Sequence, residues 1–480
     1  MNILNKRRPV LLAFSIILPF FVFSLTSCKK FIEVTAPATS TNAVNVYADD
    51  AAAIAVLTGI YGKMSSPLMS TGGIPSLSLF AGLSADEFTL YKAATGPISF
   101  YYSNALTNSN TGTTDFWTSF YPYIFYANSA LEGVNNSNSL TPAVKQQLIG
   151  EAEFVRAFCY FYLVNLYGDV PLSLQTDFET TSLLARASKS EIYDKIVSDL
   201  RDAENKLSEH FLDATLLQAT DARVRPTRWA AAALLSRAYL YSQKWDSAVA
   251  EASKLIGNSS QFSLDTVKGV FLKGSPEAIW QLQPVGFAIK NTQDAFLFTI
   301  PSTGLSNLHP VYISPQLLNA FETGDLRRNN WVDSVNIQSS LYYFPYKYKN
   351  NVLNSPVTEY ETIIRLGEQY LIRAEAEAHL NQTQKALTDL NSVRIRAGLT
   401  GLTLNTQDEI IKAILHEKQI ELFSEWGHRW LDLKRGGTVD AVMSTVTPAK
   451  GGNWNSTLQF YPIPFSEIRS NPNLKQNDGY

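Results

Sequence analysis

The chain has 480 residues, enough for two or three ordinary domains or for one large body built from repeats. Aromatic residues make up 12% of it and charged residues 17%, against about 25% charged residues in an average soluble protein. The net charge is −3 and no block of basic residues occurs, which argues against a nucleic-acid partner.

Residues 1–27 read as a targeting segment. Lys6, Arg7 and Arg8 precede an apolar run over 10–25, which is short for a membrane span. The run ends in Leu-Thr-Ser before Cys28, and this arrangement resembles a bacterial lipoprotein signal cut before that cysteine. The resemblance implies a lipid on Cys28 and a tether over 28–48. The alternative is an ordinary secretory signal with an incidental cysteine.

The region 49–256 is expected to be an N-terminal helical region with one long insertion. A helix begins at Asp49 and Asp50, whose carboxylates suit the positive end of a helix. Over 65–114 the helical spacing gives way to Gly, Ser, Thr and Asn with scattered aromatic residues, which predicts a long loop. Helical spacing returns over 117–131, where Pro122 marks either a kink or the true start of the helix.

The stretch 151–171 predicts one long buried helix. Apolar residues recur every three or four positions on two adjacent sides, so the helix needs neighbours on two sides. Thr141 and Pro142 fit its start, and Gly168 and Pro171 its end. Cys159 has no disulfide partner in such a position and reads as a core residue. Glu153 and Arg156 are spaced to pair along the helix.

Further helices suggest a repeat. A capping box at Ser188 and Glu191 opens a helix that reaches Leu207, and helices follow over 228–241 and 246–256. Tetratricopeptide units place small residues where two antiparallel helices touch. The residues that fit this scheme are Ser236, Tyr239 and Ala248 in one copy, and Ala374 and Ala386 in a second copy that has Glu377 in place of the tyrosine. The segments 142–168 with 190–207, and 49–64 with 116–133, are looser copies.

The remaining chain divides into two regions. The stretch 257–360 is aperiodic, with strand-like runs at 278–282 and 342–348 and many aromatic residues, Tyr312 among them, and is expected to form an irregular subdomain. The region 361–480 is expected to be a C-terminal helical region with a tail, and one helix is predicted from Gln407 to about Trp426. The predicted fold class is mainly α, with about four helix pairs and a large loop-rich region.

Signatures of catalysis are scarce. The sequence has no nucleophile elbow, dinucleotide fingerprint or phosphate-binding loop, and His416-Glu417 lacks the second histidine of a zinc site because Ile420 stands there. Glu417, Glu421 and Glu425 are four residues apart and share one helix face. They could serve as acids and bases of a glycoside hydrolase, or form structural ion pairs with Arg429, Lys434 and Arg435. The ion pairs are the favoured interpretation.

Aromatic side chains in the loops are the other candidates for function. A ring can stack on a sugar or an apolar group while its hydroxyl or indole N–H makes a hydrogen bond. This favours ligand-binding regions at 65–114 and 257–360. The candidate ligand-contacting residues are Tyr91, Tyr101, Tyr102, Asn104, Trp331 and Tyr342.

Several motifs resemble the SusD/RagB family of surface lipoproteins of Bacteroidetes. They cover nearly the whole chain after the targeting segment. Several of the motifs are specific, and their shared order is more so. The motifs are Cys28 followed by Lys30, EAEFVRAFCYFYLVNLYGDVPL at 151–172, the helix within 223–240, the segment 365–391, EWGHRWLDLKR at 425–435, and the tail at 461–477. Lys418 departs from the arginine that relatives often carry there.

The resemblance implies a tetratricopeptide-like scaffold with an irregular ligand-binding region, and no catalysis, cofactor or metal. It implies a protein anchored by lipid to the outer membrane at the cell surface. Its partners would be a glycan or a peptide and a SusC-like, TonB-dependent outer-membrane barrel that receives the ligand. A surface hydrolase using Glu421 or Glu425, and a scaffold that binds only proteins, remain the alternatives.

Overall fold

The computed structural model describes residues 46–65, 76–111 and 115–480, and residues 47–480 form the unit discussed here. Cys28 and the targeting segment lie outside the described residues. Tyr47, expected to belong to the tether, already packs in this unit, since it is 6% exposed. None of the described helices has the length and apolar composition needed to cross a membrane.

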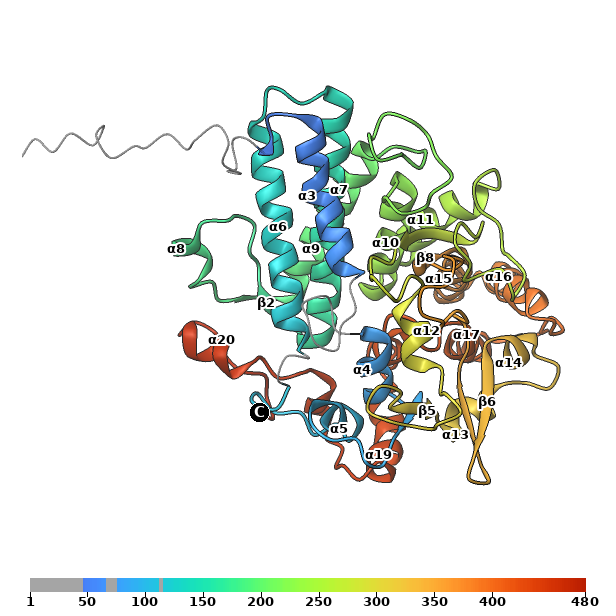
Figure 1. The fold of residues 1–480 in the computed structure, drawn as a ribbon. Helices are drawn as coiled ribbons and strands as arrows, with labels where there is room; N and C mark the ends of the chain where they lie inside the picture. Colours follow the sequence, from blue (N-terminus) through green and yellow to red (C-terminus); the bar gives the residue numbers. More distant parts are fainter. Residues whose placement is uncertain (1–45, 66–75, 112–114) are drawn as a thin grey trace, which may run out of the picture. The chain divides into compact units, whose positions relative to one another are not determined.

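The scaffold is a succession of helices that pack on their neighbours in chain order. Helix α7 lies between α6 and α9, α9 packs on α10, α10 on α11, α11 on α15, and α15 on α16 and α17. The helices α3, α6, α7 and α9 run side by side in Figure 1. The scaffold helices are α3 (Asp50–Met64), α6 (Phe116–Asn136), α7 (Pro142–Tyr167), α9 (Lys189–Lys206), α10 (Arg228–Tyr241), α11 (Trp245–Gly257), α15 (Leu366–His379), α16 (Thr383–Arg396) and α17 (Gln407–Glu421).

Helix α7 confirms the prediction of a long buried helix. Every residue from Gly150 to Tyr167 is buried, as expected of a helix with neighbours on both sides. Its N-cap is Thr141 with Pro142 in the first turn, and it ends at Gly168, whose φ of 76° is unfavourable for other residues. Cys159 is buried and free.

The predicted pairing of Glu153 with Arg156 along this helix is wrong. Arg156 instead forms a bidentate bond with Asp199 of α9, with N–O distances of 2.8 Å. Glu153 lies 3.3 Å from Lys206, near the end of α9. The neighbouring helix offers a planar, two-bond geometry that a partner on the same helix face does not.

The repeat pattern is confirmed by the packing. Ser236, Ala248, Ala374 and Ala386 are all 0% exposed, and they lie on the packed pairs α10–α11 and α15–α16. Small residues at these positions allow two helix backbones to approach each other closely.

The long loop predicted over 65–114 is wrong for much of its described part. Helix α4 (Leu77–Ser84), strand β1 (Phe88–Leu90) and helix α5 (Pro97–Tyr102) lie within it. All residues of α4 are buried, so its sequence has no polar face and therefore no helical periodicity to detect. Pro122 lies inside α6, not at its start, because α6 begins at Phe116 with Asp115 as N-cap.

The strands are short and pair in twos, and the pairs β1–β5 and β4–β8 connect the irregular region 257–360 to the rest. The antiparallel pairs are β1 with β5 (Val311–Ile313), β2 (Val170–Pro171) with β3 (Arg186–Ala187), β4 (Ala278–Leu282) with β8 (Glu361–Arg365), and β6 (Val332–Ile337) with β7 (Ser340–Pro345). The strand-like run at 278–282 is thus confirmed as β4. Trp331 stands in a hydrophobic cluster of this region that also contains Phe271, Leu317 and Phe423.

The remaining helices are short. They are α8 (Phe178–Thr181), α12 (Gln293–Phe298), α13 (Pro315–Ala320), α14 (Leu326–Asn330), α18 (His428–Arg435), α19 (Val439–Ala449) and α20 (Phe465–Ser470). The helix predicted from Gln407 to Trp426 ends earlier, at Glu421, because Ser424, Trp426 and Gly427 adopt positive φ angles that redirect the chain before α18.

Candidate ligand-binding site

A group of half-buried tyrosines gathers where β1, β5 and the β6–β7 hairpin meet. Thr89 of β1 stands opposite Tyr312 of β5 in the strand register. The ring centroids of Tyr312 and Tyr342 are 5.1 Å apart, and the rings are nearly perpendicular at 81°. Tyr102, at the end of α5, joins them because the Thr89 hydroxyl interacts with the hydroxyls of both Tyr102 and Tyr312. We call Thr89, Tyr102, Tyr312 and Tyr342 the tyrosine cluster.

The surroundings of Tyr102 and Tyr312 favour their neutral hydroxyls. Partial burial raises the pKa of Tyr102 and of Tyr312 above the ordinary value, and the nearby tyrosine hydroxyls add to that effect. The hydroxyls of Tyr102 and Tyr312 can therefore both donate and accept a hydrogen bond. Half-exposed rings that carry such hydroxyls suit a ligand with apolar faces and hydroxyl groups.

The six candidate residues divide into two sets. Tyr102 and Tyr342 belong to the tyrosine cluster, and Tyr91 lies next to it, since its backbone N–H donates to the Pro310 carbonyl 2.6 Å away, just before β5. All three are half-buried. Their contact with a ligand stays a prediction.

Burial corrects the interpretation for Tyr101, Asn104 and Trp331. Tyr101 is 0% exposed and packs edge-on against Tyr461 at 5.3 Å. Asn104 donates to the Ser84 carbonyl and accepts from the Thr447 hydroxyl. Trp331 is 0% exposed, and its indole N–H donates to the Val267 carbonyl at 2.6 Å. These buried side chains hold the region together, and they leave at most 6% of their surface exposed.

Tyr312 and Thr89 complete the cluster and were not among the candidates. A signal for Tyr312 exists in the sequence, because in Val311-Tyr312-Ile313 the two outer residues are buried and the central one faces the other way. No comparable signal marks Thr89, whose position depends on the pairing of β1 with β5, strands more than 200 residues apart.

The three glutamates of α17 and the residues after it form ion pairs, but not with the partners expected. Glu417 lies 2.6 Å from Arg327 and 3.2 Å from Arg394. Glu421 pairs with Arg327 at 2.7 Å, with Arg365 at 2.6 Å and with Arg396. Glu425 pairs with Arg365 at 2.8 Å and with Lys347.

The expected partners lie elsewhere. Arg429 forms a bidentate pair with Asp86 at 2.7 Å, Lys434 donates to the Asn165 carbonyl, and Arg435 pairs with Glu375 and Asp432. None of the three pairs with a glutamate of this set, and the chain turns sharply at Ser424–Gly427, between α17 and these residues. The partners of the glutamates come instead from four distant segments of the chain.

The neighbouring cations set the protonation of Glu421 and Glu425 against the effect of burial. Glu417 and Glu421 are 0% exposed and Glu425 is 6% exposed. Burial alone would raise the pKa of Glu421, but Arg396, Arg365 and Arg327 outweigh it and hold that pKa well below the ordinary value. Burial is likewise outweighed at Glu425, where Arg365 and Lys347 lower the pKa. A carboxylate in this state is a poor proton donor.

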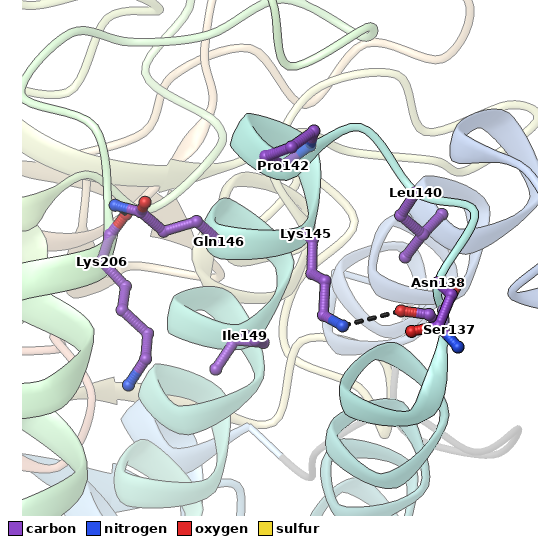
Figure 2. Close-up of a pocket in the computed structure, with 8 residues that line it drawn as sticks. All are labelled: Ser137, Asn138, Leu140, Pro142, Lys145, Gln146, Ile149 and Lys206. Atoms are coloured by element: carbon purple, nitrogen blue, oxygen red, sulfur yellow. Dashed lines mark hydrogen bonds between the residues drawn. The ribbon is translucent and has the colours of Figure 1, made fainter.

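A hollow of about 350 Å³ lies beside the start of α7 (Figure 2). Lys145 points to the end of α6, where its ammonium donates to the carbonyls of Asn135 and Ser137 at 3.0 and 2.7 Å. Gln146 donates to the Lys206 carbonyl at 3.1 Å. These side chains satisfy the free carbonyls at helix ends, so helix capping accounts for the polar side chains that line this hollow. Within the described ranges, no group of His, Cys, Asp or Glu side chains could hold a metal ion.

A helical-repeat scaffold that carries an irregular, loop-rich region defines the class of this protein. Two family models match the chain: that of the SusD family over residues 324–480, and that described as starch-binding, associating with outer membrane, over residues 83–240. The chain belongs to the SusD-like family.

Individual relatives agree with this assignment. A SusD-like protein of Formosa agariphila is 25% identical over an alignment that covers 96% of this chain and 98% of the relative. The starch-binding protein SusD of Bacteroides thetaiotaomicron is 36% identical over 124 residues, which are 25% of this chain and 21% of the relative.

Solved structures show the same fold. A SusD superfamily protein from Bacteroides vulgatus superposes with a TM-score of 0.78 at 20% identity, covering 90% of this chain and 100% of that one. A laminarin-binding SusD-like protein superposes with a TM-score of 0.73 at 23% identity, covering 89% of this chain and 99% of that one.

Proposed function

We propose that the protein is a non-catalytic lipoprotein of the cell surface that captures an oligosaccharide. The observation that carries this proposal is the tyrosine cluster, which offers half-exposed rings and neutral hydroxyls at one place. Flat rings can cover the apolar faces of sugar units while the hydroxyls bond to the sugar hydroxyls. The starch-binding and laminarin-binding relatives support an oligosaccharide over a peptide.

The buried network around Glu421 supports a role without catalysis. Glycoside hydrolysis needs one carboxyl group that carries a proton near neutral pH and a second that reaches the sugar. Glu421 and Glu425 are ionised, buried and bonded to cations from several segments. A hydrolase would be recognised by turnover of an oligosaccharide panel that is lost in the Glu421→Gln variant while the fold is retained.

Calorimetry with oligosaccharides prepared from starch and laminarin tests the binding site. We expect at least one of these to bind, and Tyr102→Ala or Tyr342→Ala to weaken that binding by about tenfold, since each removes one stacking ring. Phe178→Ala is the matched control, because Phe178 is an aromatic residue that is 78% exposed on α8. Equal affinities in the tyrosine variants and the wild type would refute this location of the site.

The proposal includes a membrane anchor and a partner. Lipid on Cys28 would hold the protein at the outer membrane, and a SusC-like, TonB-dependent barrel would receive the bound ligand. Gentle solubilisation of outer membranes should then co-purify this chain with a large barrel protein, and Cys28→Ser should release it into the soluble fraction. A chain that purifies without any barrel contradicts the partnership. A Cys28→Ser variant that stays membrane-bound would show that the barrel, and not the lipid, is the main anchor.

A further inference from the structure

A second hollow, of about 480 Å³, lies where the C-terminal tail crosses the end of α7 and the start of α9. This volume is within the range of small-molecule sites. Its lining includes Asp169, Lys189, Thr457, Gln459, Phe460 and Asp478, and we call it the tail pocket. No part of the tyrosine cluster lines it.

Arg186 makes the wall of the tail pocket rigid. Its guanidinium donates to the Asp169 carbonyl at 2.7 Å, to the Lys475 carbonyl at 2.9 Å and to the Asn477 side-chain oxygen at 2.6 Å. Asn477 in turn donates to the carbonyls of Tyr167 and Tyr461. The tail is thus fixed to the end of α7 without any ligand, which lowers the entropic cost of binding.

Other groups of the tail pocket have hydrogen-bonding capacity to spare. Among the described residues, neither the Lys189 ammonium nor the Asp478 carboxylate has a hydrogen bond or ion pair, and the Thr457 hydroxyl is a buried oxygen without a partner. Gln459 uses its amide nitrogen on the Ser456 carbonyl, which leaves its oxygen available. One oxygen of Asp169 accepts from the backbone N–H of Lys189, and the other has no hydrogen-bond partner within the described part of the chain.

A half-buried ring borders these polar groups. The ammonium of Lys434 lies 4.7 Å from the ring centroid of Phe460. Gly168 lies beside the ring, and a Cβ atom there would be 3.6 Å from it, so the missing side chain keeps that edge of the ring open.

We propose that the tail pocket is a second saccharide-binding site, separate from the tyrosine cluster. Carboxylates and an amide oxygen accept from sugar hydroxyls, the Lys189 ammonium donates to them, and the edge of Phe460 meets an apolar sugar face. The presence of both charge signs favours a neutral polyol over an anion or a cation. The ligand class rests on the proposed function.

One aromatic core adjoins a ring of each site in the sequence. In this core Tyr101 and Tyr461 pack edge-on at 5.3 Å. The next residue after Tyr101 is Tyr102 of the tyrosine cluster, and the residue before Tyr461 is Phe460 of the tail pocket. One aromatic core thus supports a ring at each site.

Protection of lysines from acetylation tests the tail pocket directly. The protein is treated with an acetylating N-hydroxysuccinimide ester, with and without saturating oligosaccharides from starch or laminarin, and each lysine is quantified by mass spectrometry. We expect the sugar to reduce acetylation of Lys189 severalfold and to leave Lys244, an exposed lysine at the start of α11, unchanged. Equal acetylation of Lys189 with and without a sugar that calorimetry shows to bind would overturn the inference.

Two variants separate this inference from the proposed function. In Tyr102→Ala/Tyr342→Ala, protection of Lys189 should persist while calorimetric binding weakens, and loss of that protection would overturn the second site but not the first. In Asp478→Ala, protection of Lys189 should fall while binding at the tyrosine cluster stays. Protection of Lys189 together with unaltered affinity in the tyrosine variants would support the tail pocket and refute the tyrosine cluster. If no oligosaccharide binds in calorimetry and none protects Lys189 from acetylation, both the tyrosine cluster and the tail pocket are refuted as binding sites.

Discussion

Glu421 is a residue on which three buried arginines converge. Its carboxylate contacts Arg327, Arg365 and Arg396, and all four side chains are at least nine-tenths buried. Such a network contributes little net stability when complete, because desolvation offsets the attraction. Removal of one partner is costly, since it leaves buried charges uncompensated.

Glu421→Gln should therefore destabilise the fold by about 3–5 kcal/mol, measured as the free energy of unfolding in urea. Asp408→Asn is the matched control on the same helix, where the carboxylate is exposed, and we expect a change within about 0.5 kcal/mol. A loss below about 1 kcal/mol for Glu421→Gln would show that the arginines find other partners.

Glu87 is a buried carboxyl group whose pKa is raised, whereas the pKa of Glu421 is lowered. Burial, followed by the nearby Asp86 carboxylate, raises the pKa of Glu87 from 4.5 to about 8. Between these values the folded state holds a proton that the unfolded state has released, so stability is complete below pH 4.5 and is lost as the pH rises through 8. The Glu87 side chain also accepts from the Ser424 backbone N–H at 3.2 Å, which a glutamine can do as well.

Glu87→Gln should therefore flatten the fall in stability between about pH 5 and 8, and should be more stable than the wild type at pH 8 by on the order of 2–4 kcal/mol. Urea unfolding at a series of pH values checks this. The slope should not vanish, because burial also raises the pKa of Glu153 and of Glu377 to about 7. Glu179→Gln, on the exposed helix α8, should follow the wild-type curve, and the prediction fails if Glu87→Gln does so too.

At the scale of residues, the sequence predicts which side chains share a helix face but does not predict which residues form ion pairs with them. The four-residue spacing places Glu417, Glu421 and Glu425 together, as periodicity requires. Their arginines come from α14, from β8 and from α16, and nothing local indicates that these segments converge on α17. Burial of Tyr101 and Trp331 is equally non-local, since an aromatic residue in an irregular stretch can pack inward or outward with the same neighbours in sequence.

At the scale of elements, close approach between helices depends on single glycines. Gly150 lies in α7 where α9 ends, and a Cβ atom built there would be 2.9 Å from the Leu207 side chain. Gly59 lies inside α3, and a Cβ atom there would have nothing within 4 Å. Both are helical glycines, so they share the same gain in helix propensity on substitution and differ only in space.

Gly59→Ala should stabilise the fold by about 0.5–1 kcal/mol through helix propensity. Gly150→Ala should destabilise it by about 1–3 kcal/mol, because α9 must shift or the side chain of Leu207 must leave its rotamer. Thermal unfolding of the two variants beside the wild type gives the comparison. If both substitutions stabilised the protein, the α7–α9 contact would be shown to accommodate the added methyl group without loss of stability.

The elements that the sequence predicts best have an amphipathic pattern or clear ends. Helix α9 carries the predicted capping box at Ser188 and Glu191, and α7 stops at Gly168 as expected. Helix α4 was missed because it is buried on all sides. The tyrosine cluster could be predicted only in part, since the pairing of β1 with β5 brings together residues 88–90 and 311–313.

At the scale of the whole unit, the two segments matched by the family models interlock. Arg237 of α10 binds Glu368 of α15 through two bonds of 2.6 Å, and Asp86 binds Arg429 of α18. The Tyr461 backbone N–H donates to the Leu166 carbonyl of α7 at 2.8 Å. Each contact joins the segment 83–240 to the segment 324–480, so neither segment completes its core alone.

This interlock predicts a single cooperative unfolding transition for residues 47–480. Far-ultraviolet circular dichroism, which follows the helices, and tryptophan fluorescence, which follows buried rings such as Trp280 and Trp430, should give the same midpoint. Arg237→Met leaves the buried Glu368 unpaired and should lower both midpoints equally, by a free energy of about 3–5 kcal/mol. Lys412→Met, on the exposed face of α17, should leave both midpoints unchanged. Separate midpoints for the two probes in Arg237→Met would show instead that the halves unfold independently and that Arg237 and Glu368 only fasten one to the other.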